Sequence, residues 1–263
     1  IVEIYNNLGI GGFGYIYATT FLMISLVYMV IRKNTLKKIK YRFLILIGII
    51  PMFLMIFKAS YAISLIILIL GIIFVICFKN KKTMTLSFSI GMVLLLFFQN
   101  TIGNLFLRIA DIFFHKSILN IRFNEIAEVF LNNSVDGDLG NRFYRYFLSF
   151  KVFLKYPLFG IIGPFGNNKI AIGDHSGWFD FLASYGLFSS IPLFIVIFIN
   201  FKKIISFFKK SNYFMMMLLI QILFIIYGFI NPILTVFEIG FVIFYILPSI
   251  PFLPYAFSKD KVS

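Results

Sequence analysis

Two arginines of this chain, Arg142 and Arg145, could grip a phosphate or diphosphate, because a planar guanidinium forms paired hydrogen bonds with such groups. They fall in the segment Asn141 to Tyr156, where the residue spacing predicts an amphipathic helix at the membrane interface, with Ser149 on the arginine face and Pro157 ending the helix. The predicted apolar face holds Phe143, Phe147, Phe150 and Leu154. The alternative is that both arginines only anchor this helix among lipid headgroups.

One of the two histidines lies in the sequence Gly173 to Asp180, where the chain enters an apolar run. An imidazole can accept a proton near neutral pH, so His175 is a candidate base. Helical spacing predicts that it shares a face with three residues, Phe179, Leu182 and Gly186. The alternative is a polar interface residue without a chemical role.

The neighbours of His175 have predicted roles of their own. Asp174 or Ser176 is the predicted N-cap of the following helix, and Trp178 suits the aromatic belt of a membrane interface. Asp180 lies one turn deeper, where an unpaired carboxylate is costly, so it needs either a partner or a role.

The composition predicts an integral membrane protein, because 60% hydrophobic and 13% charged residues cannot form a soluble domain with a polar surface. We expect an all-α, polytopic bundle of membrane helices with one large extracytoplasmic loop that contains interfacial helices. The net charge of +14 does not indicate nucleic acid as a partner, because the basic residues cluster at the ends of apolar runs. The single cysteine, Cys77, excludes an internal disulfide, and no metal ligand cluster or cofactor site is evident.

About seven runs are long enough to approach the ~20 residues that cross a bilayer. They are Gly14 to Ile31, Phe43 to Phe57, Tyr61 to Phe78, Thr85 to Phe98, Phe179 to Phe201, Tyr213 to Ile230, and Ile233 to Phe257. Basic clusters after the first, third, fifth and seventh runs place those ends in the cytoplasm. The chain begins at Ile1 without a methionine, so we expect it to be the C-terminal part of a longer protein.

This topology divides the chain into four N-terminal spans (1–98), a large extracytoplasmic loop (99–178) and three C-terminal spans (179–263). The loop contains both histidines and six of the ten acidic residues, so it is the expected place for chemistry. A solvated loop without a function is the alternative.

Three motifs resemble the O-antigen ligase and polymerase superfamily of bacterial membrane proteins. They are Arg142 with Tyr146, Tyr156-Pro157-Leu158-Phe159-Gly160, and His175-Ser176 followed after nine residues by Gly186-Leu187. The turn from Lys58 to Ala62 is also similar to a serine-arginine turn of the family, with Tyr61 where arginine is usual. The resemblance covers about the last two-thirds of the chain and suggests an N-terminally truncated member.

The resemblance implies inverting glycosyl transfer on the outer face of the plasma membrane, with an undecaprenyl-diphosphate-linked glycan as substrate. Arg142 would hold the diphosphate, while His175, oriented by Asp174 or Asp180, would orient or deprotonate the attacking hydroxyl. Other residues expected to bind diphosphate or glycan are Arg145, Lys58, Ser60 and Asp174. Membrane lipid, a flippase and a chain-length regulator are the other expected partners. Glu238 is a further candidate near the same end, or a structural helix contact.

The leading hypothesis is a polymerase of oligosaccharide repeat units for a capsule, an O-antigen or another exopolysaccharide. A ligase that transfers finished glycan to a lipid or protein acceptor would use the same residues. A polysaccharide transporter or flippase is the alternative from another class, and it would distribute polar residues through the spans.

Overall fold

The structure, a computed structural model, describes residues 12–32, 39–59, 62–77, 98–115, 117–132, 137–161 and 172–252. Within these ranges every regular element is a helix and no strand occurs, so the predicted all-α class is confirmed. The longer helices are α2 (Phe13–Ile31), α3 (Ile39–Lys58), α4 (Ala62–Cys77), α6 (Gln99–Asp111), α7 (Ile118–Asn132), α8 (Gly137–Lys155), α9 (Gly177–Phe208) and α10 (Phe214–Ile230). Short pieces follow: η1 (Ile233–Thr235), α11 (Phe237–Phe241), the π-helical η2 (Val242–Ile246), α12 (Leu247–Ser249) and η3 (Ile250–Phe252).

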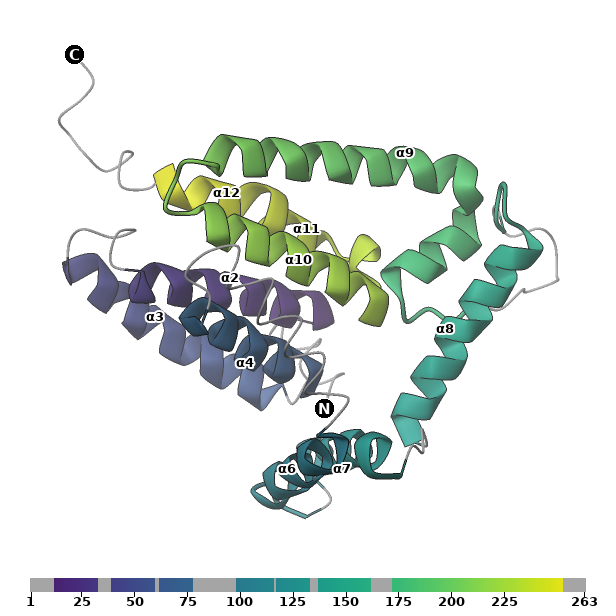
Figure 1. Ribbon diagram of the computed structural model, residues 1–263, viewed down its shortest axis with the longest axis horizontal. Coiled ribbons are helices and arrows are strands. Elements are labelled where there is room, and N and C mark those ends of the chain that lie inside the picture. Colours follow the sequence, from purple (N-terminus) through teal and green to yellow (C-terminus); the bar gives the residue numbers. More distant parts are fainter. Residues whose placement is uncertain are drawn as a thin grey trace.

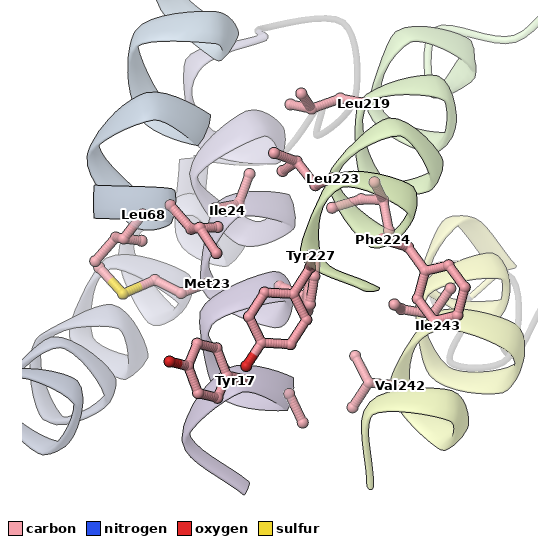
Figure 2. Close-up of a cluster of buried hydrophobic side chains, with 14 of the residues drawn as sticks. Tyr17, Met23, Ile24, Leu68, Leu219, Leu223, Phe224, Tyr227, Val242 and Ile243 are labelled. Atoms are coloured by element: carbon pink, nitrogen blue, oxygen red, sulfur yellow. The ribbon is translucent and has the colours of Figure 1, made fainter. Parts of the chain in front are cut away.

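Helix α2 is the centre of the bundle, with α3, α4, α10 and α11 packed around it (Figure 1). Its side chains Phe21 and Ile24 are fully buried. Figure 2 shows α2 meeting α10, where the rings of Tyr17 and Tyr227 have centroids 4.4 Å apart. Gly71 of α4 lies against Ile24 and leaves no room for a side chain, so these two helices approach closely.

Contacts near the helix termini show which ends of the bundle lie together. The Tyr28 hydroxyl of α2 donates to the carbonyl of Asn212, in the turn between α9 and α10, at 2.7 Å. Arg32, the C-cap of α2, donates to the carbonyl of Val75 near the end of α4 at 2.9 Å. At the opposite end, Gly14 lies against Glu238 of α11. The predicted topology likewise places the ends of α2 and α4 with the α9–α10 turn, and the start of α2 with the start of α11.

Helix α9 is interrupted at Gly186, whose φ of 63° lies in the left-handed region. The break frees backbone groups, and the segment after α8 pairs with them. The carbonyls of Pro157 and Leu158 accept from the N–H groups of Leu187 and Phe188 at 2.8 and 3.0 Å. The N–H of Ile161 donates to the carbonyl of Ala183 at 3.0 Å. These contacts between residues 156–161 and 183–188 are called the α8–α9 junction below.

Two glycines make the α8–α9 junction possible. Gly160 also has a left-handed φ, 62°, and a Cβ there would meet the backbone of Ser184 to Gly186. A Cβ on Gly186 would in turn meet the backbone of Leu158 and Gly160. Two of the family-like motifs, residues 156–160 and 186–187, are therefore the two halves of one backbone contact.

Two of the described helices are long and apolar enough to cross a membrane: α2 over Gly14–Ile31 and α9. Shorter apolar helices cover Ser64–Ile76, Phe214–Ile230 and Phe237–Phe252. The described part of the predicted span from Ile233 begins with a 3-10 turn after Pro232, becomes helical at Phe237 and contains a π-helical stretch. The predicted span from Thr85 to Phe98 lies almost entirely outside the described residues.

The predicted interfacial helix corresponds to α8, which begins at Gly137 and ends at Lys155, one residue before the predicted end. In Figure 1, α8 runs obliquely across the direction shared by the bundle helices. Helices α6 and α7 pair with each other below it, through stacked rings such as those of Phe106 and Phe123, 6.1 Å apart.

Candidate active site

The predicted arginine face of α8 is the face that contacts the rest of the protein. Arg142, Arg145, Tyr146 and Ser149 are spaced i, i+3, i+4 and i+7, so they lie on one side of the helix. Each makes a hydrogen bond either to the loop that precedes α9 or to the end of α10. The sequence thus predicted the grouping of Arg142, Arg145 and Ser149 correctly.

Ser149 is the centre of these contacts and is completely buried. Its hydroxyl donates to one carboxylate oxygen of Asp180, at 2.5 Å, and accepts from the backbone N–H of Gly173, at 2.8 Å. Gly173 itself lies directly on the Arg145 carbonyl, where no Cβ fits. One serine therefore fixes both the loop before α9 and the first turn of α9 against α8.

The first turn of α9 is closed by its own side chains. Ser176 is the N-cap, as one of the two predicted alternatives, and its hydroxyl accepts from the N–H of Phe179. The second carboxylate oxygen of Asp180 accepts from the N–H of Ser176 at 2.7 Å. The N–H of Gly177 donates to the carbonyl of Asn231 at 2.9 Å. These three N–H groups are occupied, so a phosphate at this helix start would depend on side-chain donors.

His175 lies before the helix and not on it. The predicted face shared with Phe179, Leu182 and Gly186 is therefore wrong, because the N-cap falls at Ser176 and His175 precedes it. Its Nδ1 lies 2.5 Å from the backbone carbonyl of Asp174, whose φ of 56° is left-handed. When Nδ1 carries the proton, it donates to this carbonyl and Nε2 keeps a lone pair for an incoming proton.

We expected a carboxylate of Asp174 or Asp180 to orient the His175 ring, and the structure shows other partners for both residues. The Asp180 carboxylate accepts from Ser149 and from the Ser176 N–H, and Asp174 contacts the ring through its main chain. Asp180 is buried, and its two bonds give it a structural role at the start of α9.

Asn231 is a further polar residue of this site, which the sequence motifs did not reveal. It is the C-cap of α10, it is only 2% exposed, and its side-chain oxygen accepts from Arg142 at 3.5 Å. Tyr146 donates to the neighbouring carbonyl of Ile230 at 2.8 Å, and Arg145 donates to the carbonyl of Gly173 at 3.5 Å. The arginine face of α8 therefore joins the end of α10 to the loop that carries His175.

Two other predicted residues, Lys58 and Glu238, lie apart from these contacts. Lys58 ends α3, next to Phe57, whose ring lies tilted against that of Phe113 in the α6–α7 turn, with centroids 6.0 Å apart. Ser60 lies outside the described residues. Glu238 lies in the first turn of α11 against Gly14 of α2.

Trp178, which the sequence suggested for the aromatic belt of an interface, packs between two helices. Its side chain is 8% exposed and lies on Gly228, and its indole N–H donates to the carbonyl of Ile225 at 2.9 Å. The tryptophan packs α9 against α10 because a glycine on α10 leaves space for the ring.

Comparison of the chain with protein-family models, with curated proteins and with solved structures finds no match. Among the residues that the structure describes, no group of three or more His, Cys, Asp or Glu side chains is placed to hold a metal ion.

Proposed function

We propose that this protein is a polymerase of undecaprenyl-diphosphate-linked oligosaccharide repeat units for a bacterial surface polysaccharide. It acts as an inverting glycosyltransferase on the outer face of the plasma membrane. The observation that carries this proposal is the clamping of the arginine face of α8 onto the loop of His175, through Ser149, Gly173 and Asp180.

The chemistry needs two kinds of group, and this arrangement offers both. Arg142, with Arg145 one turn away, would hold the diphosphate and stabilise the negative charge that grows on it. His175 would take the proton of the acceptor hydroxyl through Nε2. The hydroxyl oxygen bonds to the anomeric carbon, the bond from that carbon to the diphosphate oxygen breaks, and undecaprenyl diphosphate leaves with the electron pair. A single displacement inverts the anomeric centre.

The proposed membrane setting is a multi-pass bundle whose outer surface meets lipid. Large apolar side chains are exposed on several helices, among them Phe43 on α3, Ile73 on α4 and Phe198 on α9. Such surface would be costly in water and is ordinary in lipid. The site lies at the end of the bundle where α9 starts and α10 ends, which the distribution of Lys and Arg assigns to the outside.

The proposal is tested by complementing a strain that lacks this gene and makes no polymer. We expect Arg142→Ala and His175→Ala to insert into the membrane at wild-type level and to leave single repeat units on the carrier. Lys209→Ala, at the far end of α9, is the matched control and should restore the full ladder. Wild-type chain lengths from both site variants would contradict the proposal. A normal carrier ladder with the glycan missing from its final acceptor would identify a ligase instead.

A further inference from the structure

Helix α8 has a second face that the candidate site does not use. Phe143, Phe147, Phe150 and Leu154 form a stripe along the helix, which we call the apolar stripe. Phe147 is 63% exposed and Leu154 is 61% exposed, so most of this stripe points away from the protein, although the ring of Phe150 also lies 5.9 Å from that of Phe179 on α9. The opposite side is fixed by the hydrogen bonds of Arg142, Tyr146 and Ser149, so the helix cannot turn the stripe inward.

Positive charge borders the apolar stripe. Lys151 and Lys155 are exposed and lie on the next face of the helix, about 70–110° around from the stripe. From Leu139 to Gly173 the sequence contains no acidic residue and carries only basic charge, on Arg142, Arg145, Lys151, Lys155 and Lys169. An apolar face with a basic border fits an anionic membrane surface.

The direction of α8 fits the same surface. It runs obliquely across the bundle at the end where α9 begins (Figure 1). A helix at this end of the bundle reaches the level of the membrane surface if the bundle helices cross the membrane. Its stripe would then reach the boundary between headgroups and acyl chains, while the lysine side chains extend to the headgroups.

We propose that α8 lies in the outer leaflet and binds anionic phospholipid in preference to zwitterionic phospholipid. The apolar stripe supplies the affinity for the bilayer, and Lys151 and Lys155 supply the preference for headgroups with a net negative charge. This inference rests on the faces of α8 and does not depend on the glycosyl transfer proposed above.

Tryptophan fluorescence tests this directly, because the native Trp178 is buried and contributes a nearly constant background. Phe147→Trp places a reporter on the apolar stripe of the full chain, reconstituted in bilayers that contain brominated phosphatidylglycerol or brominated phosphatidylcholine. We expect both lipids to quench the reporter and the phosphatidylglycerol to quench it at lower mole fraction. The double variant Lys151→Gln with Lys155→Gln should lower that preference, by at most roughly fivefold per lysine.

Ile191→Trp is the matched control, because Ile191 is 50% exposed on α9 and the nearest basic residue along that helix, Lys202, lies three turns on. It should be quenched equally by the two lipids. Phe143→Trp serves as a second reporter if Phe147→Trp does not fold. Equal quenching at the stripe, or a preference that survives removal of both lysines, would overturn the proposal. Absence of quenching at the stripe would also overturn it and would indicate that protein or water covers this face.

Discussion

At the scale of single residues, Ser149 is the one whose loss we expect to be most costly relative to its size. Its hydroxyl is buried and serves a backbone N–H and a carboxylate at once, so a methyl group in its place leaves both without this partner. Unsatisfied buried groups of this kind cost about 1–3 kcal/mol. The Asp180 carboxylate accepts hydrogen bonds from Ser149 and from the Ser176 N–H, which is why it does not orient His175.

We therefore expect Ser149→Ala to lower the free energy of unfolding by about 1–3 kcal/mol, and to lower transferase activity because the His175 loop loses an attachment. Thermal unfolding of the purified protein in detergent measures the first effect. Ser206→Ala, at an exposed position of α9, is the control and should change stability by less than about 0.5 kcal/mol. Equal melting temperatures for the two variants would show that the Ser149 contacts are dispensable.

At the scale of elements, the α8–α9 junction decides how the two halves of the site are placed. Helix α8 carries the arginines and α9 follows the His175 loop. The two helices meet at Ser149–Asp180 and again at the glycine contact after α8. Two separated attachments prevent rotation of one helix on the other, so the arginine face stays on the loop.

Gly160→Ala and Gly186→Ala test this junction. A left-handed φ costs a residue with a Cβ roughly 1–2 kcal/mol, and the new methyl group also meets the opposing backbone. We expect each variant to lower stability by at least that amount, and the double variant to lose less than the sum, because the first change already breaks the shared contact. Gly48→Ala on α3, where nothing lies within 4 Å, should instead stabilise by up to about 1 kcal/mol. Additive losses would mean that the two glycines act independently.

The sequence predicted some elements well and others poorly, for physical reasons. Helical spacing predicted the two faces of α8, because amphipathic periodicity is a local property. Ser176 was one of two candidate caps, and the choice of cap shifted His175 out of the helix. The burial of Trp178 depends on Gly228, fifty residues away, so no local pattern could reveal it. The glycines at 160 and 186 were visible as a motif, but their mutual contact needs the fold.

At the scale of the whole molecule, the contacts at the two ends of the bundle predict that Asn212 and Tyr144 face opposite sides of the membrane. Asn212 lies with the ends of α2 and α4, whereas Tyr144 lies on α8 near the site. After replacement of Cys77, the only native cysteine, we expect Asn212→Cys to react with a membrane-impermeant maleimide only from the cytoplasmic side. Tyr144→Cys should react only from the outside. Labelling of both positions from one side would contradict the proposed topology.

The measurement that tests the proposed function most directly uses the purified protein in lipid nanodiscs with a defined undecaprenyl-diphosphate repeat unit as its only substrate. We predict that wild-type protein releases one undecaprenyl diphosphate for each unit added and lengthens the glycan on the remaining carrier, while Arg142→Ala does neither. The melting transition shows whether the wild-type protein is folded. If the folded wild-type protein leaves carrier and glycan unchanged, the account is contradicted.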